Sequence, residues 1–261
     1  MSNKSSARGF VSSEGSGAVF TGIYFIEGKR TPFGKYCGAL STVSPTDLGI
    51  ISAKGVLDAA KVKPADVDQV IVSNIGQSSA DTFFLPRHIA LYSGVPQGVP
   101  ALMVQRICGS GIEVIGTAAE QIALGKANLV LGCGTESMSR YPLASFGARQ
   151  GFQMGKPDFV DMLTASLDDT AAVPMGTTAD NLAAEVGVTR EDVDRFSLRS
   201  QERYAQALEA GFFADELIPV QNGMHEVATL KPRRVKLSGV ETCTADEHPR
   251  KTTLEKLAKL P

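Results

Sequence analysis

The stretch ALMVQRICGSGIEVIGTAAEQIAL, residues 101–124, decides the fold. Residues 101–107 are mostly apolar and favour a buried strand, whereas residues 111–124 repeat apolar side chains at helical spacing. Small residues, Gly109, Ser110 and Gly111, separate the two patterns and allow a tight turn. Cys108 therefore stands where a strand passes into a helix.

This junction suits a nucleophile. Backbone N–H groups and the positive end of the helix dipole would stabilise a thiolate and lower the pKa of the Cys108 thiol. The small side chains that follow Cys108 leave room for a bulky thioester. A buried structural cysteine in a glycine-rich turn is the alternative, and these residues alone leave both interpretations open.

Strands and helices alternate on both sides of the junction. Strand patterns occupy residues 19–26, 70–72 and 128–131, and a second helix pattern occupies residues 87–93. Ser44 and Pro45 mark the start of a further helix, whose apolar stripe continues to Leu57. This alternation predicts an α/β fold, in which helices cover both faces of a largely parallel sheet.

The pattern changes after Gly134. Prolines interrupt residues 135–175, which we interpret as an excursion from the sheet. Capping-box spacings at residues 177–180 and 189–192 predict two helices, the second ending near Ala210. We therefore expect a flexible tail over residues 1–18, a core half over 19–134, and a partly helical loop or lid domain over 135–261.

Composition limits the function classes. A net charge of -2 gives no electrostatic case for nucleic acid, and no apolar run is long enough to cross a membrane. The four cysteines are widely spaced, which indicates a reducing compartment, the cytoplasm or an organelle matrix, and no metal site. His88 is expected to pack within a helix and His225 to lie in a surface loop.

Six segments, taken in order, resemble the thiolase family, specifically its 3-ketoacyl-CoA thiolase and acetyl-CoA acetyltransferase type. They are RTPFG (30–34), QSSAD (77–81), QRICGSG (105–111), GTESMS (134–139), MGTTADN (175–181) and DEHPR with TTL (246–250, 252–254). The resemblance implies a thiolase-like βαβ core with an inserted loop domain, and it covers residues 20–261.

The resemblance also implies roles. Cys108 would accept the acyl group, its N–H would bind the thioester oxygen, and Gly109, Ser110 and Gly111 would support the turn. Met175 would line the acyl pocket, and Arg250 and Thr252 would face coenzyme A, a substrate; no metal or redox cofactor is implied. The alternatives are a core methionine, a solvated arginine and a helix-capping threonine.

The chain departs from the family pattern at several points. Gln105 stands where asparagine is usual, and Pro174 stands where the short-chain acetoacetyl-CoA branch has histidine. The chain is also about one residue shorter than usual between Arg250 and Thr252. The family's Gly-His-Pro and Cys-x-Gly-Gly-Gly motifs do not occur, and His248 belongs instead to the CoA-facing segment.

We therefore expect the C-terminal half of the fold to be absent from this chain. A homo-oligomer, or a complex with a chain carrying the missing half, would then supply the groups of the two absent motifs. One alternative is a non-catalytic acyl-CoA-binding protein or partner-dependent subunit. Another is a relative of the β-ketoacyl synthases, against which the long stretch from Thr135 to Pro261 argues.

Overall fold

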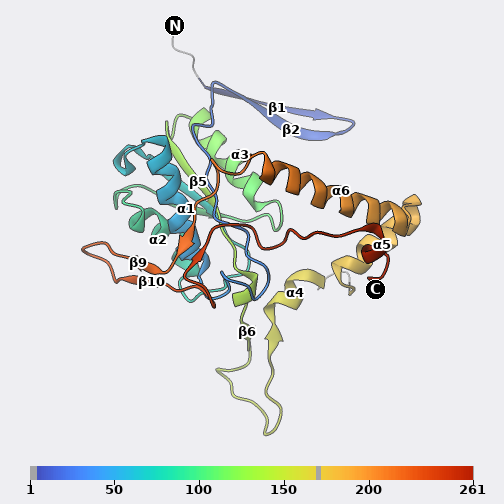
Figure 1. Ribbon diagram of the computed structural model, residues 1–261. Coiled ribbons are helices and arrows are strands. Elements are labelled where there is room, and N and C mark those ends of the chain that lie inside the picture. The colour runs from blue at the N-terminus through green and yellow to red at the C-terminus, as the bar shows by residue number, and fades with distance from the viewer. Residues whose placement is uncertain (1–4, 169–171, 261) are drawn as a thin grey trace.

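The computed structural model describes residues 5–168 and 172–260 (Figure 1). Its helices are α1 (Pro45–Ala60), α2 (Leu85–Tyr92), α3 (Ser110–Ala123), α4 (Met162–Asp168), α5 (Met175–Val186), α6 (Arg190–Glu209) and α7 (Leu254–Leu257). Its strands are β1 (Ser6–Ser12), β2 (Gly15–Thr21), β3 (Gln69–Ser73), β4 (Ala101–Val104), β5 (Val130–Gly134), β6 (Leu143–Ala144), β7 (Val160–Asp161), β8 (Val220–Gln221), β9 (Gly223–His225), β10 (Arg233–Val235) and β11 (Thr242–Cys243).

A parallel sheet of three strands, in the order β4-β3-β5, forms the centre of the fold. The central strand β3 pairs Val70 with Ala101 of β4 and Leu131 of β5. Val70, Ile71 and Val72 are fully buried, as expected for a strand covered on both faces. The predicted α/β fold is confirmed.

Helices cover both faces of this sheet. Val70 and Val72 share one hydrophobic cluster with residues of α1 and α2, such as Ile50 and Ile89. On the other face α3 approaches so closely that a Cβ added at Gly132 would lie 3.0 Å from Val114. Alternate side chains of one strand thus contact different helical layers.

Two helix starts follow the capping rules. The side chain of Ser44 accepts a hydrogen bond from the Asp47 N–H at the start of α1, and Pro45 is the first helical residue. Thr189 and Asp192 form a complete capping box on α6. The predicted start of α5 is wrong, because α5 begins at Met175 after Pro174 and has no side-chain cap.

The N-terminal segment differs from the expected tail and first core strand. Residues 1–4 lie outside the described residues, but β1 and β2 form an antiparallel hairpin that projects from the body (Figure 1). β2 ends at Thr21 and pairs with β1 alone among the described strands, so residues 19–26 contribute no core strand. The apolar pattern of residues 19–26 indicates that this part of the chain can form a strand. It does not indicate with which other strand the segment pairs.

The region after β5 contains short elements. β6 pairs with β7 in the excursion after Gly134, and β8 and β9 pair with β11 and β10. Val220 and Val235 belong to a second hydrophobic cluster together with Val43 and Leu48 at the start of α1. The last part of the expected loop domain therefore packs on the core half.

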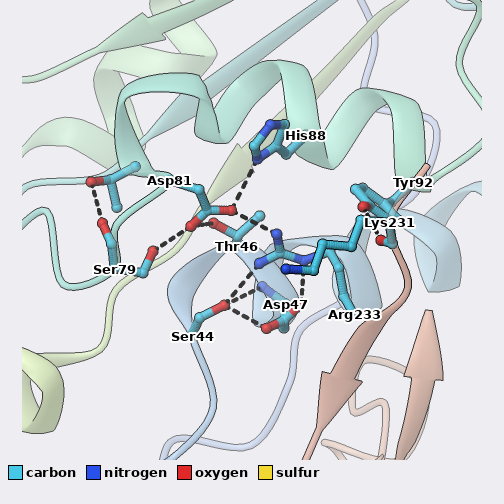
Figure 2. Close-up of polar contacts among 10 residues, drawn as sticks. Ser44, Thr46, Asp47, Ser79, Asp81, His88, Tyr92, Lys231 and Arg233 are labelled. Carbon is cyan, nitrogen blue, oxygen red and sulfur yellow. Dashed lines mark hydrogen bonds and ion pairs between the residues drawn. The ribbon is translucent and has the colours of Figure 1, made fainter. Parts of the chain in front are cut away.

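Arg233 of β10 connects this region to α1 and to the segment that leads into α2 (Figure 2). Its guanidinium donates to Asp47 and Asp81 at 2.7 Å each and lies over the ring of Tyr92. Asp81 also accepts hydrogen bonds from Thr46, Ser79 and His88. Burial opposes ionisation of Asp81, but these hydrogen bonds and the Arg233 charge lower its pKa well below the usual range.

The histidines of this region only partly match expectation. His88 lies in α2 as predicted, with its Nδ1 2.9 Å from Asp81. The prediction for His225 is wrong, because His225 is buried in β9 and its Nε2 has no hydrogen-bond partner among the described residues. The polar composition of residues 222–251 does not indicate that His225 is buried near Asp47 and Lys54 of α1.

No described helix is long and apolar enough to cross a membrane.

Replacing Arg233 tests the contact with Asp47 and Asp81. Arg233→Gln leaves two carboxylates without their cation, so we expect the free energy of unfolding to fall by roughly 2–3 kcal/mol. The difference should shrink below about pH 4, where Asp81 of the unfolded chain is protonated. Urea unfolding followed by circular dichroism measures both effects. Arg234→Gln, on the exposed side of the same strand, should change the free energy of unfolding by less than about 0.5 kcal/mol. If the two variants lose equal stability, the contact of Arg233 with Asp47 and Asp81 is not what stabilises the fold.

His225 should make stability depend on pH. Burial, with the charges of Lys54 and Arg233, lowers the pKa of His225 despite Asp47 nearby, so the unfolded chain binds the proton more tightly. The free energy of unfolding should therefore fall from pH 7 to pH 5, and by less in His225→Gln. Urea unfolding at both pH values checks this. The exposed His248→Gln serves as control and should keep the wild-type dependence.

Candidate active site around Cys108

Cys108 lies in a tight turn between β4 and α3. The strand ends at Val104, so the prediction that it continues to Ile107 is wrong. The Ser110 hydroxyl accepts from the Arg106 N–H at 2.8 Å and donates to the Ile107 carbonyl, which folds residues 106–110 into a closed turn. Cys108 is exposed at this turn, and Gly109 caps the helix that begins at Ser110.

Ile107 adopts a strained backbone conformation. Its φ of 45° lies in the left-handed region, which is unfavourable for a β-branched residue. Its side chain is exposed, so burial of that side chain does not compensate for the strain. Strained residues of this kind cluster at functional sites, and Ile107 directly precedes Cys108.

The carboxyl ends of β3 and β5 meet beside this turn. Glu136, two residues after β5, accepts hydrogen bonds from the N–H groups of Ile75 and Gly76 at 2.8 and 3.3 Å, and from the Asn74 amide at 3.2 Å. Tyr141 lies against Gly76, where any side chain would overlap its ring. Burial and the Glu136 carboxylate raise the pKa of the Tyr141 phenol.

The sequence analysis named GTESMS as a family segment but assigned no role to Glu136, Asn74 or Tyr141. A signal was present for two of them, because Asn74 and Glu136 each follow a buried strand. Polar residues at the carboxyl ends of neighbouring parallel strands lie at one edge of a sheet. Nothing in the local pattern indicates that Tyr141 folds back over Gly76.

A cavity of about 950 Å³ contains the Cys108 turn. Its lining joins segments far apart in sequence: residues 27–36, the end of β5 with residues 135–139, one side of α1, the start of α3, and His248. The Arg30 guanidinium makes two hydrogen bonds to Asp246, at 2.7 and 3.0 Å, which bring the segment after Asp246 to this wall. Ser110 and Gly111 line the cavity as well.

The other predicted binding residues lie elsewhere. Arg250 and Thr252 line a shallower groove of about 360 Å³ along α6, together with residues such as Gln201 and Tyr204. Met175 is the first residue of α5, is half exposed, and lines neither of these two cavities. Arg250 and Thr252 thus line one groove, which includes neither Met175 nor Cys108.

The remaining cysteines differ from Cys108 in environment. Cys133 and Cys243 are buried, and burial raises the pKa of each thiol. Cys37 is exposed, with its N–H bonded to the Ser139 hydroxyl at 2.9 Å. Within the described residues no group of three histidine, cysteine or acidic side chains is placed to hold a metal ion. The arrangement around Cys108 is that of an exposed thiol at a helix start.

Two substitutions at Ile107 test the strain. Glycine adopts a left-handed conformation at no steric cost whereas alanine does not, so Ile107→Gly should be more stable than Ile107→Ala by about 1 kcal/mol. Both variants remove the same exposed side chain, so the difference between their free energies of unfolding reports the cost of the left-handed backbone conformation. Urea unfolding of the two variants measures it. Ile107→Ala as the more stable variant would show that residue 107 is not left-handed in solution.

Comparison with known proteins places this geometry in a family. The family model of the thiolase N-terminal domain matches residues 23–261. The mitochondrial 3-ketoacyl-CoA thiolase of Bos taurus is 41% identical over 247 residues, which cover 94% of this chain and 59% of the bovine protein. The human counterpart is 42% identical over the same length. The β-ketothiolase BktB of Cupriavidus necator is 36% identical over 240 residues.

Solved structures agree with the sequence match. The crystal structure of human mitochondrial 3-ketoacyl-CoA thiolase in complex with CoA superposes with a TM-score of 0.80 at 40% identity, covering 90% of this chain and 56% of that one. An acetyl-CoA acetyltransferase from Syntrophomonas wolfei gives 0.77 at 31% identity. The chain spans a little over half the length of these relatives. It belongs to the thiolase family, of which it carries the N-terminal domain.

Proposed function

We propose that this chain provides the nucleophile-bearing half of a thiolase, which cleaves a 3-oxoacyl-CoA with CoA or runs the reverse condensation. One observation carries the proposal: Cys108 is an exposed thiol held at a strained turn, inside a cavity bordered by the family's own segments. The relatives named as 3-ketoacyl-CoA thiolases and β-ketothiolases support the reaction class.

In the cleavage direction the Cys108 thiolate would attack the 3-keto carbon of the substrate. The bond between C2 and C3 then breaks, the acetyl-CoA fragment leaves as a carbanion and takes up a proton, and the acyl group stays on the sulfur. The thiol of a second CoA loses its proton and displaces the acyl group, which restores Cys108. N–H donors at the start of α3 would stabilise the oxyanion.

The groove along α6 is the proposed site for the nucleotide end of CoA. Arg250 contributes an exposed guanidinium there, and such a group suits a phosphate. The Gln201 side chain accepts from the Arg250 N–H at 2.9 Å and so ties the arginine segment to α6. The role of Met175 in an acyl pocket stays a prediction, because no described acyl pocket includes it.

The proposed reaction needs a general base and a proton shuttle. His248 is the one histidine that lines the Cys108 cavity in the described part of the chain, and the motif around it is not that of the family base. We propose that both groups come from a C-terminal thiolase half, which the matched relatives possess beyond the region shared with this chain. A non-catalytic acyl-CoA-binding subunit is the alternative, and it predicts CoA binding without acyl transfer.

The first test is formation of an acyl-enzyme. Incubating the chain, together with a C-terminal thiolase half, with acetoacetyl-CoA and with a longer 3-oxoacyl-CoA should add one acyl group to Cys108, detected by intact mass and peptide mapping. Cys108→Ser should remove the adduct completely. The matched control is Cys37→Ser, because Cys37 is the other exposed thiol of the described chain and should not be required.

Thiolysis of the same substrates by the chain alone, and by the chain with a C-terminal thiolase half, separates the two proposals. Turnover only in the mixture would support a partner-dependent thiolase. An adduct that persists in Cys108→Ser would remove Cys108 from the mechanism. CoA binding without any adduct, in correctly folded protein, would favour the binding subunit.

A further inference from the structure

Gly76 has no side chain because the ring of Tyr141 occupies that space. The φ of Gly76 is not positive, so its backbone conformation does not require glycine. A Cβ at Gly76 would lie 1.8 Å from Cε1 and Cζ of Tyr141 and 2.2 Å from its hydroxyl oxygen. Any larger residue at this position would displace the ring. The contact therefore fixes the Tyr141 phenol close to the end of β3.

The carboxylate of Glu136 is held in one orientation beside this contact. Its Oε2 accepts from the N–H groups of Ile75 and Gly76 at 2.8 and 3.3 Å. Its Oε1 accepts from the Asn74 amide at 3.2 Å and from the Ser137 N–H at 3.3 Å. Both oxygens are thus bound by donors of the protein, and the carboxylate is a fixed charge.

This fixed charge opposes ionisation of the nucleophile. Glu136 lines the same cavity as Cys108. A carboxylate disfavours a second negative charge nearby, so Glu136 acts against formation of the Cys108 thiolate. Each hydrogen that is donated to the carboxylate reduces its field at the sulfur. A further donor on Glu136 would therefore favour the thiolate.

The Tyr141 phenol is able to act as this donor. Burial, the charge of the Glu136 carboxylate and the charge of the Cys108 thiolate all raise the pKa of the phenol. A phenol that responds to both charges is close enough to act on both. It also keeps its proton over the pH range in which a thiol ionises.

We propose that Tyr141 is a positioning residue for the nucleophile, which donates its phenolic hydrogen to Glu136 and thereby weakens the repulsion between this carboxylate and the Cys108 thiolate. The inference rests on the proposed function, in which Cys108 is the nucleophile. No covalent bond changes in this step. Tyr141 alters only the fraction of Cys108 that is ionised at a given pH.

Other charged groups also lie near the thiol. Arg106 and Glu113, on the Cys108 turn and the helix that follows, pair with each other. Burial raises the pKa of the Cys133 thiol, which therefore stays neutral at pH 7. The other ionisable groups that line the cavity are Glu27, Lys29, Arg30, Lys35, Tyr36 and His248. All of these groups are unchanged in the variants below, so a comparison between variants removes their contribution.

Alkylation of Cys108 by iodoacetamide, followed by peptide mapping from about pH 6 to pH 10, tests the proposal on the 261-residue chain alone. Tyr141→Phe keeps the ring over Gly76 and removes only the hydroxyl. Its rate at pH 7 should be about threefold lower than that of the wild type, and the two rates should converge at high pH. Tyr24→Phe is the control, because Tyr24 is 76% exposed and lines neither cavity.

A double-mutant comparison separates this role from simple structural support. Glu136→Gln removes the repelling charge, so the rate of Cys108 alkylation at pH 7 should rise by up to about tenfold. Adding Tyr141→Phe to Glu136→Gln should then have no further effect, because the charge that the phenol acts on is gone. A threefold loss that persists in the Glu136→Gln background would show that Tyr141 does not act through Glu136, and the proposal would be wrong.

Gly76→Ala displaces the phenol without changing Tyr141 itself. It should slow the alkylation of Cys108 at pH 7 in the same way as Tyr141→Phe. The matched control is Gly98→Ala, because a Cβ at Gly98 meets open space. Unchanged rates in Tyr141→Phe and Gly76→Ala, both folded by circular dichroism, would overturn the proposal. If Glu136→Gln does not fold, the agreement of these two variants decides.

These outcomes are distinct from those of the proposed function, because alkylation requires no acyl-CoA. The expected alkylation rates without any acyl adduct on Cys108 would support the role of Tyr141 and contradict the thiolase reaction. An acyl adduct together with unchanged alkylation rates would do the reverse.

Discussion

The structure depends on one constraint, the parallel pairing of β3 with a strand on each side. Parallel strands end at the same edge, so the residues that follow each strand converge there whatever their distance in sequence. Asn74 after β3, the Cys108 turn after β4 and Glu136 after β5 meet in this way. The Glu136 carboxylate then joins two of these loops by accepting from Ile75 and Gly76. The candidate site is thus a direct consequence of the sheet topology.

The Cys108 turn is also a place where local and global preferences disagree. Ile107 is a β-branched residue that suits a strand, yet it occupies a left-handed conformation. The Ser110 hydroxyl bonds the backbone on either side of Ile107, and the following helix begins at the same serine. These bonds offset the strain and leave the thiol exposed.

The two sides of the sheet differ in how completely they are closed. Near β3 and α1, Arg233 binds Asp47 and Asp81, and Val220 of β8 and Val235 of β10 are packed against the start of α1. At β5 the backbone groups of Gly132 and Gly134 face a cavity, and the apolar residues before Glu27 are exposed.

The sequence by itself determined the α/β class, the starts of α1 and α6, and the position of Cys108 at a junction between strand and helix. These features depend on periodicity and on capping groups within a few residues, which a local pattern contains. Only the tertiary structure decided that residues 6–21 form a hairpin, that His225 is buried, and that Arg233 reaches Asp81 across 152 positions of the chain. Such contacts depend on which apolar faces pack together in the fold. A polar segment has the same local sequence pattern whether it is exposed to solvent or binds a carboxylate of another layer. Met175, Arg250 and Thr252 stay predictions for the same reason, because their roles depend on surfaces that no local pattern describes.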